Sequence, residues 1–188
     1  MIKLKVSIIY SWFIRSLTYF LPNHPVFMRF RGFLYSLMMR HCGKNFQVAS
    51  SVIFNSLSGI SIGKNVYIAP NNVFIGTNIY IEDEVILGPS SVFSGSNHQF
   101  DGVSFRLLPS ASIGPLIIRE GSWVAANCTL TSGSILPKHS ILAAGAVLNK
   151  PLMEQQSIYG GIPAKKIGAV RIAQKEGLNK KKPLIDKS

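Results

Sequence analysis

The sequence predicts an all-β solenoid, a parallel β-helix built from six-residue repeats. In one stretch, aliphatic residues follow one another at steps of six without exception, at Ile118, Val124, Leu130, Leu136, Leu142 and Leu148. An earlier stretch keeps the step with one residue inserted after Ile68, at Ile62, Ile68, Ile75, Ile81 and Leu87. A helix repeats its apolar residues every three or four positions and a strand every two. A period of six therefore indicates short strands separated by corners.

Each repeat also carries a turn signal three residues after its aliphatic residue. This position holds Asn65, Asn78, Glu84, Ser90, Gly121, Asn127, Gly133, His139 and Gly145. Six of these nine are Asn or Gly, which enter the left-handed backbone region at low cost. The residues that come next are Val66, Ile79, Val85, Ser91, Ser122, Cys128, Ser134, Ser140 and Ala146, and most of them are small. We expect a corner in every repeat and stacked coils that share one narrow core.

Segments outside the repeat would cover the two ends of the stack. We divide the chain into an N-terminal helical and lead-in region at 1–58, the β-helix domain at 59–167, and a basic C-terminal helix and tail at 168–188. Residues 6–21, VSIIYSWFIRSLTYFL, fit an amphipathic helix that packs on the core or lies on a membrane face. Arg15 interrupts this apolar run short of the roughly 20 residues that a membrane span needs.

The net charge of +12 is concentrated at the two ends of the chain. Residues 1–50 hold seven Lys and Arg and no acid, and residues 165–188 hold eight and two, which leaves five bases and six acids between them. The central part of the chain is nearly neutral and contains no recognisable nucleic-acid-binding motif, which argues against nucleic acid as a partner. The basic ends fit either solvated termini or attraction to an anionic membrane surface. Two cysteines are too few for a disulfide framework, so we expect a cytoplasmic location, with membrane association through the N-terminus as an alternative.

The repeat is interrupted once, at residues 97–117. A long insertion disrupts stacking unless it leaves the stack as a loop, and loops on rigid scaffolds are where functional residues gather. His98, in the stretch GSNHQF, stands at the start of this loop and is either a functional base or an ordinary polar loop residue. Asn97 and Asp101 flank it and could orient the ring or bind an acceptor. Asp101 followed by Gly102 is equally well explained as a turn.

The other histidines and the cysteines indicate no second site. His139 occupies the turn position of the repeat, and His24 and His41 lie in the N-terminal region, so we interpret all three as structural. No three histidines have metal-ligand spacing, and we expect no metal. No motif places a base beside Cys42 or Cys128, so we expect no covalent enzyme intermediate.

Two stretches resemble the hexapeptide-repeat acyltransferases. They are the repeat IREGSWVAANCTLTSGSILPKHSILAAGAVLNK at 118–150, and SIYGGIPAKKI at 157–167, which is similar to that family's terminal glycine-proline-alanine motif. The resemblance covers about residues 59–167. It implies a left-handed β-helix with three repeats per coil, a homotrimer with active sites between subunits, and acyl transfer from a thioester. It also implies that His98 is the catalytic base, since an imidazole can take the proton of an acceptor hydroxyl.

The same resemblance implies acetyl-coenzyme A as the donor. By position in the motifs, the donor contacts correspond to Trp123, Ala126, Ala144, Asn149, Lys150 and Lys165. Small residues let a pantetheine arm lie against the backbone, and cations suit its phosphates. Asn149 departs from the Thr or Ser that the family often has before the lysine, which puts that side-chain contact in doubt. Trp123 either packs on the acetyl group or is an aromatic residue on the outer face of the coil.

Similarity to the small, single-domain branch of the family favours an O-acetyltransferase acting on a hydroxyl of a sugar or a surface polysaccharide or lipopolysaccharide precursor. The alternatives are an N-acetyltransferase on an amino or nucleotide sugar, and serine acetyltransferase, whose acidic histidine-loop signature and long helical N-terminal domain are not evident. In another class, a non-catalytic β-helix scaffold would fit a break without a usable base, and His98 argues against it. The expected partners are a sugar or glycan acceptor, further copies of the chain and a membrane surface at the N-terminus.

Overall fold

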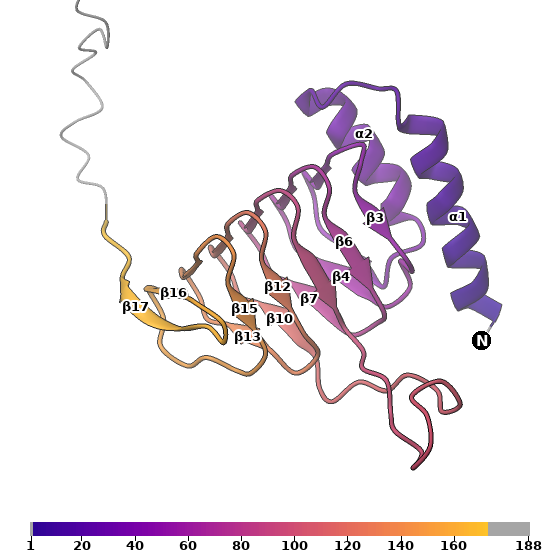
Figure 1. The fold of residues 1–188 in the computed structure, drawn as a ribbon. Coiled ribbons are helices and arrows are strands. Elements are labelled where there is room, and N and C mark those ends of the chain that lie inside the picture. The colour runs from indigo at the N-terminus through magenta and orange to yellow at the C-terminus, as the bar shows by residue number, and fades with distance from the viewer. Residues whose placement is uncertain (1, 173–188) are drawn as a thin grey trace, which may run out of the picture.

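The chain winds into a stack of coils with two helices at one end, as a computed structural model shows for residues 2–172 (Figure 1). The helices are α1 (Ile2–Thr18) and α2 (Pro25–Ser36). The strands form three sheets, here named A, B and C. Sheet A contains, in order, β1 (His41–Cys42), β4 (Ile60–Ile62), β7 (Ile79–Ile81), β10 (Leu116–Ile118) and β13 (Ile135–Leu136). Sheet C contains β3 (Ile53–Phe54), β6 (Val73–Ile75), β9 (Val92–Ser94), β12 (Thr129–Leu130) and β15 (Val147–Leu148).

Sheet B is the longest of the three. It contains β2 (Gln47–Val48), β5 (Tyr67–Ile68), β8 (Ile86–Leu87), β11 (Trp123–Val124), β14 (Ile141–Leu142), β16 (Ser157–Gly160) and β17 (Lys165–Ala169). Every strand pair is parallel except β16 with β17. Because each strand pairs with its equivalent one coil away, the inward residues stack in columns, and Leu87, Val124 and Leu142 are direct partners in sheet B. The predicted fold class, an all-β solenoid of six-residue repeats, is confirmed.

The predicted corners are confirmed position by position. All nine residues assigned to the turn slot have positive φ, from 53° at His139 to 81° at Gly133. The nine residues that follow them are all buried and fill the narrow interior at the bends. The turn slot is therefore a backbone requirement, which Asn and Gly meet at the least cost.

The inserted residue lies one strand later than the sequence analysis placed it. Phe74 is the inward residue of β6 and is fully buried, whereas Ile75 is 40% exposed. The Phe74 ring stacks between Phe54 and Phe93, with centroid distances of 4.8 and 4.5 Å. Neighbouring strand positions face opposite sides, so only one of the adjacent apolar residues Phe74 and Ile75 can point inward. The spacing of the repeat alone could not show which one does.

The solenoid also begins earlier than residue 59. Strands β1, β2 and β3 lie within the predicted lead-in region and form a first coil, in which Val48 and Phe54 are buried six residues apart. The inward residue of the next strand, Ile62 of β4, comes eight residues after Phe54 instead of six. Because of this longer step, the six-residue period does not reveal the first coil.

Helices α1 and α2 cover the open end of the first coil, as the sequence analysis expected for the N-terminal region. Neither helix has the length and apolar content to cross a bilayer, within the residues the structure describes. Helix α2 begins at an N-cap, His24, whose Nδ1 accepts a hydrogen bond from the Val26 amide at 3.5 Å, and Pro25 takes the first helical position. Met28 and Tyr35 of α2 are buried against the core.

At the other end, Lys165–Ala169 turns back as β17 and pairs antiparallel with β16. Residues 168 and 169, the start of the predicted C-terminal helix and tail, thus belong to a strand. The helix expected in 168–188 falls mostly on residues 173–188, which lie outside the described part of the chain.

Arg31 joins α2 to both of its neighbours. Its guanidinium is fully buried and donates to the Val48 carbonyl at 2.6 Å, to the Thr18 hydroxyl and carbonyl at 3.2 Å each, and to the Leu21 carbonyl at 3.1 Å. Burial lowers the pKa of this guanidinium from its usual value. The residue therefore fixes the end of α1, helix α2 and the first coil together with one planar group.

Replacing this group tests the cap. Arg31→Met keeps the apolar volume but leaves buried carbonyls without donors, so the free energy of unfolding should fall by about 3 kcal/mol. Chemical denaturation followed by circular dichroism measures the loss. The matched control is Arg29→Met, because exposed Arg29 makes one hydrogen bond, to Asn45 at 2.7 Å, and should cost less than about 1 kcal/mol. Equal denaturation midpoints for the two variants would show that the buried network does not hold the cap.

Candidate functional site

The break in the repeat is a loop that projects from the stack (Figure 1). It connects β9 of sheet C to β10 of sheet A, so it leaves the solenoid at the corner between these sheets. Asn97 and Ala111 close its base with two backbone hydrogen bonds of 2.7 and 2.9 Å. The predicted loop at 97–117 is thus present, and residues 95–115 are the ones that lie between the two strands.

The return of the loop is fastened to the next coil by one buried serine. Ser132 donates to the Gly114 carbonyl at 2.9 Å and accepts from the Ile113 amide at 3.0 Å, and its hydroxyl lies 3.1 Å from that of Ser112. The loop is therefore held at both of its ends by the rigid scaffold, which fixes where its first residues begin.

His98 directly follows the bridge residue Asn97 and is exposed. Within residues 2–172, its ring makes no hydrogen bond, and neither Asn97 nor Asp101 contacts it through one. The position of His98 at the base of an anchored loop leaves its imidazole open to a substrate. The orienting role considered for its two neighbours has no support from contacts within one chain.

Asp101 forms a local turn. Its Oδ1 accepts from the amides of Val103 at 2.8 Å and Ser104 at 2.7 Å, and Gly102 adopts a φ of 100°. These two amides, Ser104 first, hold the pKa of the Asp101 carboxyl below its usual value. A lowered pKa means that the acceptor stays ionised across neutral pH, and its hydrogen bonds weaken only as the pH falls through that lowered value.

Three of the predicted donor residues lie in and beside sheet B. Trp123 of β11 stands on the outer face between Ile86 and Ile141, and its side chain is 46% exposed. Ala126 and Ala144 occupy equivalent corners between sheets B and C in successive coils, and the Ala126 carbonyl accepts from the Gly145 amide at 3.0 Å. Because both corner residues are small, the backbone is accessible along this edge.

The three remaining donor residues are exposed. Asn149 and Lys150 directly follow β15, at the corner between sheets C and A from which the loop leaves two coils earlier. Lys165 begins β17 and pairs with Gly160, at the sheet B edge. The predicted donor residues therefore lie in sheet B, at Trp123 and Lys165, and at the two corners that flank sheet C.

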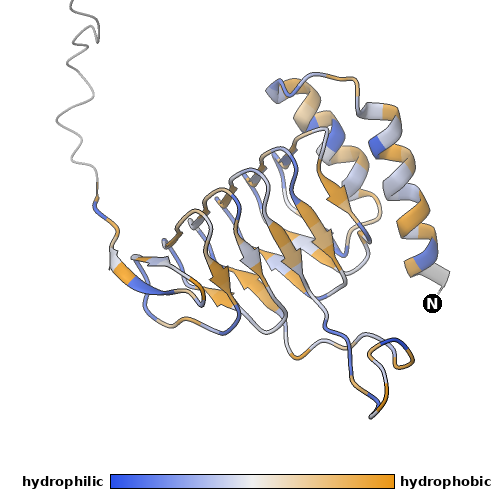
Figure 2. Ribbon diagram, in the orientation of Figure 1, coloured by the Kyte–Doolittle hydropathy of each residue, from blue (hydrophilic) through white to orange (hydrophobic). Residues whose placement is uncertain are grey.

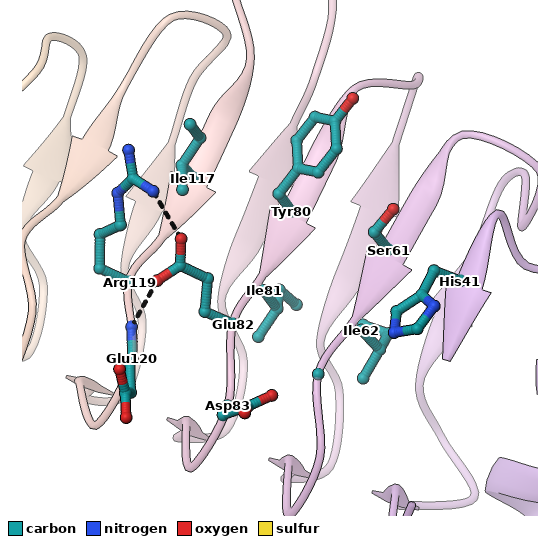
Figure 3. Close-up of a pocket in the computed structure, with 11 residues that line it drawn as sticks. His41, Ser61, Ile62, Tyr80, Ile81, Glu82, Asp83, Ile117, Arg119 and Glu120 are labelled. Carbon is teal, nitrogen blue, oxygen red and sulfur yellow. Dashed lines mark hydrogen bonds and ion pairs between the residues drawn. The ribbon is translucent and has the colours of Figure 1, made fainter. Parts of the chain in front are cut away.

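A hollow of about 420 Å³ lies elsewhere, on the outer face of sheet A (Figure 3). Tyr80 and the structural His41 line it, and Arg119 pairs there with Glu82 at 2.6 Å. Neither His98 nor any predicted donor residue contributes to its wall. Periodicity gave no sign of this hollow, because Ser61, Tyr80 and Ile117, which line it, occupy ordinary outward positions of sheet A.

Neither cysteine is a ready nucleophile. Burial raises the pKa of the Cys128 thiol, which lies in the small corner slot, and raises that of Cys42 to about 11. Both thiols therefore stay protonated near neutral pH. His139 stands at a turn with φ of 53°, as predicted. The described residues contain no group of three His, Cys, Asp or Glu side chains placed to hold a metal ion.

Several known proteins are similar to this chain in sequence and in architecture. Galactoside O-acetyltransferase of Escherichia coli is 24% identical over 148 residues, which is 77% of this chain and 71% of that protein. The crystal structure of a maltose O-acetyltransferase from Clostridium difficile matches with a TM-score of 0.77 at 18% identity, covering 89% of this chain and 88% of the other. A hexapeptide-repeat acetyltransferase from Vibrio cholerae, complexed with acetyl coenzyme A, matches with a TM-score of 0.75 at 21% identity over 89% of each chain. No protein-family model matches the sequence.

The regular corners, the three parallel sheets and the anchored loop define a β-helix of the hexapeptide-repeat class. In sequence and in fold the chain is similar to hexapeptide-repeat acetyltransferases. This agrees with the resemblance carried by residues 118–150 and 157–167.

The turn at Asp101 can be tested without a substrate. Asp101→Asn should keep it, because an amide oxygen can accept the same two hydrogen bonds, whereas Asp101→Ala removes the acceptor. Hydrogen exchange at the Val103 and Ser104 amides should become roughly tenfold faster in the alanine variant and stay near the wild-type rate in the asparagine variant. Unchanged exchange in both variants would show that the carboxylate does not order the loop.

Proposed function

We propose that the chain transfers an acetyl group from acetyl-coenzyme A to a hydroxyl of a sugar or of a surface polysaccharide precursor. The observation that carries the proposal is His98, an open imidazole at the base of the single loop that interrupts the repeat. The sequence relationship to galactoside O-acetyltransferase supports a sugar hydroxyl as the acceptor. The acetyl coenzyme A complex of the Vibrio cholerae structure supports the donor.

His98 acts as the general base in the proposed reaction. The neutral imidazole takes the proton of the acceptor hydroxyl while the hydroxyl oxygen attacks the carbonyl carbon of the thioester. The tetrahedral intermediate then expels the coenzyme A thiolate, which receives the proton back from the imidazolium. The carbon–sulfur bond breaks, the ester bond forms, and the enzyme ends the cycle unchanged. With both thiols protonated and buried or half-buried, transfer is direct from donor to acceptor.

The donor would extend across sheets B and C, from Trp123 on the outer face of sheet B to the two corners that flank sheet C. Ala126 and Ala144 leave the backbone open to the pantetheine arm, and Trp123 supports the acetyl end. Lys150 and Lys165 supply cations for the phosphates, with the backbone at Asn149 as a further contact. Asp101 and Asn97 contribute by shaping the loop beside His98.

The proposed assembly is a homotrimer with active sites between subunits. The hollow on sheet A contains neither His98 nor a predicted donor residue, and the loop exposes large apolar side chains to solvent. These are Phe100, Val103, Phe105, Leu107, Leu108 and Ile113. A neighbouring copy would cover this surface and supply the second wall that two substrates need.

Removal of the proposed base tests the reaction. Thiol release from acetyl-coenzyme A is measured with a panel of sugars, amino sugars and nucleotide sugars, which also separates O- from N-acetylation. His98→Ala should lower the rate with the accepted class by about 100-fold, because general-base catalysis is lost. The control is His139→Asn, which replaces a turn histidine by a residue that tolerates the same positive φ, and it should retain wild-type rate. If His98→Ala kept more than about a tenth of that rate, the base would have to be sought elsewhere.

The donor site is tested by binding. Lys150→Gln removes an exposed cation from the proposed phosphate contact and should raise the Kd of coenzyme A by about fivefold to tenfold, as measured by calorimetry. Lys138→Gln is the control, because the Lys138 ammonium is already paired with Glu120 at 3.0 Å. The same Kd in all three proteins would place the phosphates away from Lys150.

A further inference from the structure

Helix α1 turns its polar side toward the protein. The residues buried against the solenoid and α2 are Ser7, Ser11, Ile14 and Thr18, which follow one another at helical spacing. Ser7 Oγ accepts from the Leu57 and Ser58 amides at 2.7 and 3.1 Å, and Ser11 Oγ donates to the Phe54 carbonyl at 2.7 Å. The hydroxyls thereby satisfy backbone groups at the open edge of the first coil.

The outward side of α1 is consequently apolar. Its exposed residues are Leu4, Val6, Ile8, Ile9, Trp12, Phe13 and Leu17, and Tyr19 and Phe20 extend the surface past the end of the helix. Trp12 is 60%, Phe13 53% and Phe20 89% exposed. Figure 2 shows hydrophobic residues on α1 and α2 at this end of the stack. A surface helix of a water-soluble domain has the opposite arrangement, with its apolar stripe on the core.

The charge of this region is of one sign. Residues 1–50 hold seven Lys and Arg and no Asp or Glu. Lys5 lies between Leu4 and Val6 in the sequence and is exposed as they are, Arg29 of α2 is exposed, and Arg15 is half-buried. Aromatic and aliphatic residues bordered by cations are the composition of helices that lie in the plane of a membrane interface. Anionic headgroups would satisfy the cations while the apolar side enters the acyl boundary.

We propose that the outward side of α1, together with Tyr19 and Phe20, docks the protein on an anionic lipid surface. The helix lies in the interface plane and its hydroxyl side keeps its hydrogen bonds to the first coil. Contact with a second copy through the same surface is disfavoured, because residues 1–50 bring no acid to neutralise the cations of the facing copy. The inference is independent of the acetyl-transfer reaction and concerns a surface at the end of the stack, separate from the corner that carries the loop (Figure 1).

Vesicle flotation of the full-length chain tests this surface. The probes are vesicles of phosphatidylcholine alone and of phosphatidylcholine with phosphatidylglycerol. Wild type should float with the anionic vesicles and release as salt is raised. The double variant Trp12→Ser with Phe13→Ser should lower the partition coefficient by at least about tenfold, since two large apolar side chains are lost from the contact.

The matched control is Met153→Ser with Ile172→Ser, which removes two apolar side chains that are each 86% exposed outside the N-terminal region. It should float as wild type does. Circular dichroism confirms that each variant is folded, and sedimentation without lipid gives its mass. The inference is overturned if wild type floats with neither vesicle or with both equally, or if the Trp12 and Phe13 variant floats as well as wild type. A smaller mass for that variant without lipid, with no vesicle binding by wild type, would instead make the surface a contact between copies.

Discussion

A strand of two or three residues buries very few side chains, and the whole protein depends on how this shortage is met. In β11 only Val124 faces inward, and it gains a hydrophobic environment because Leu87 and Leu142 lie directly on either side of it in the parallel register. Stacking converts isolated aliphatic residues into continuous columns. The corners make the stacking possible, since a residue at positive φ after most of the strands turns the chain into the next sheet.

A stack that grows by backbone pairing leaves an open edge at each end, and the two ends are closed differently. At the first coil, the hydroxyls of Ser7 and Ser11 replace the missing strand, and Arg31 of α2 satisfies the Val48 carbonyl. At the last coil, β17 returns antiparallel on β16 and ends the parallel series. The polar inner side of α1 follows from the first solution, because an edge of unpaired amides and carbonyls needs hydrogen-bonding partners more than it needs apolar contact.

The repeating features of the fold could be predicted from the sequence, whereas features that depend on contacts between coils could not. The corners could be located residue by residue because positive φ restricts the choice of residue wherever it recurs, and even His139 fitted the series. The inward choice between Phe74 and Ile75 could not be made, since it depends on the ring stack across three coils. The loop and His98 were found as an interruption of the pattern. The distribution of the donor residues over sheet B and two corners was not predicted, because it depends on which sheet each repeat enters.

The loop can be inserted without cost to the core, and this explains why the chemistry is proposed there. Across the insertion, Ile81 still pairs with Ile118 and Phe93 with Leu130, so the columns continue as if the segment were absent. The loop sequence is thereby freed from packing demands. A convex corner provides only one wall, however, whereas direct transfer requires the thioester, the hydroxyl and the imidazole to meet with water excluded. In the proposed assembly, the exposed and mutually packed rings of Phe100 and Phe105, 5.0 Å apart, gain burial from another copy of the chain. On the proposed mechanism, assembly and catalysis are therefore one requirement, because the partner that buries these rings also closes the site around His98.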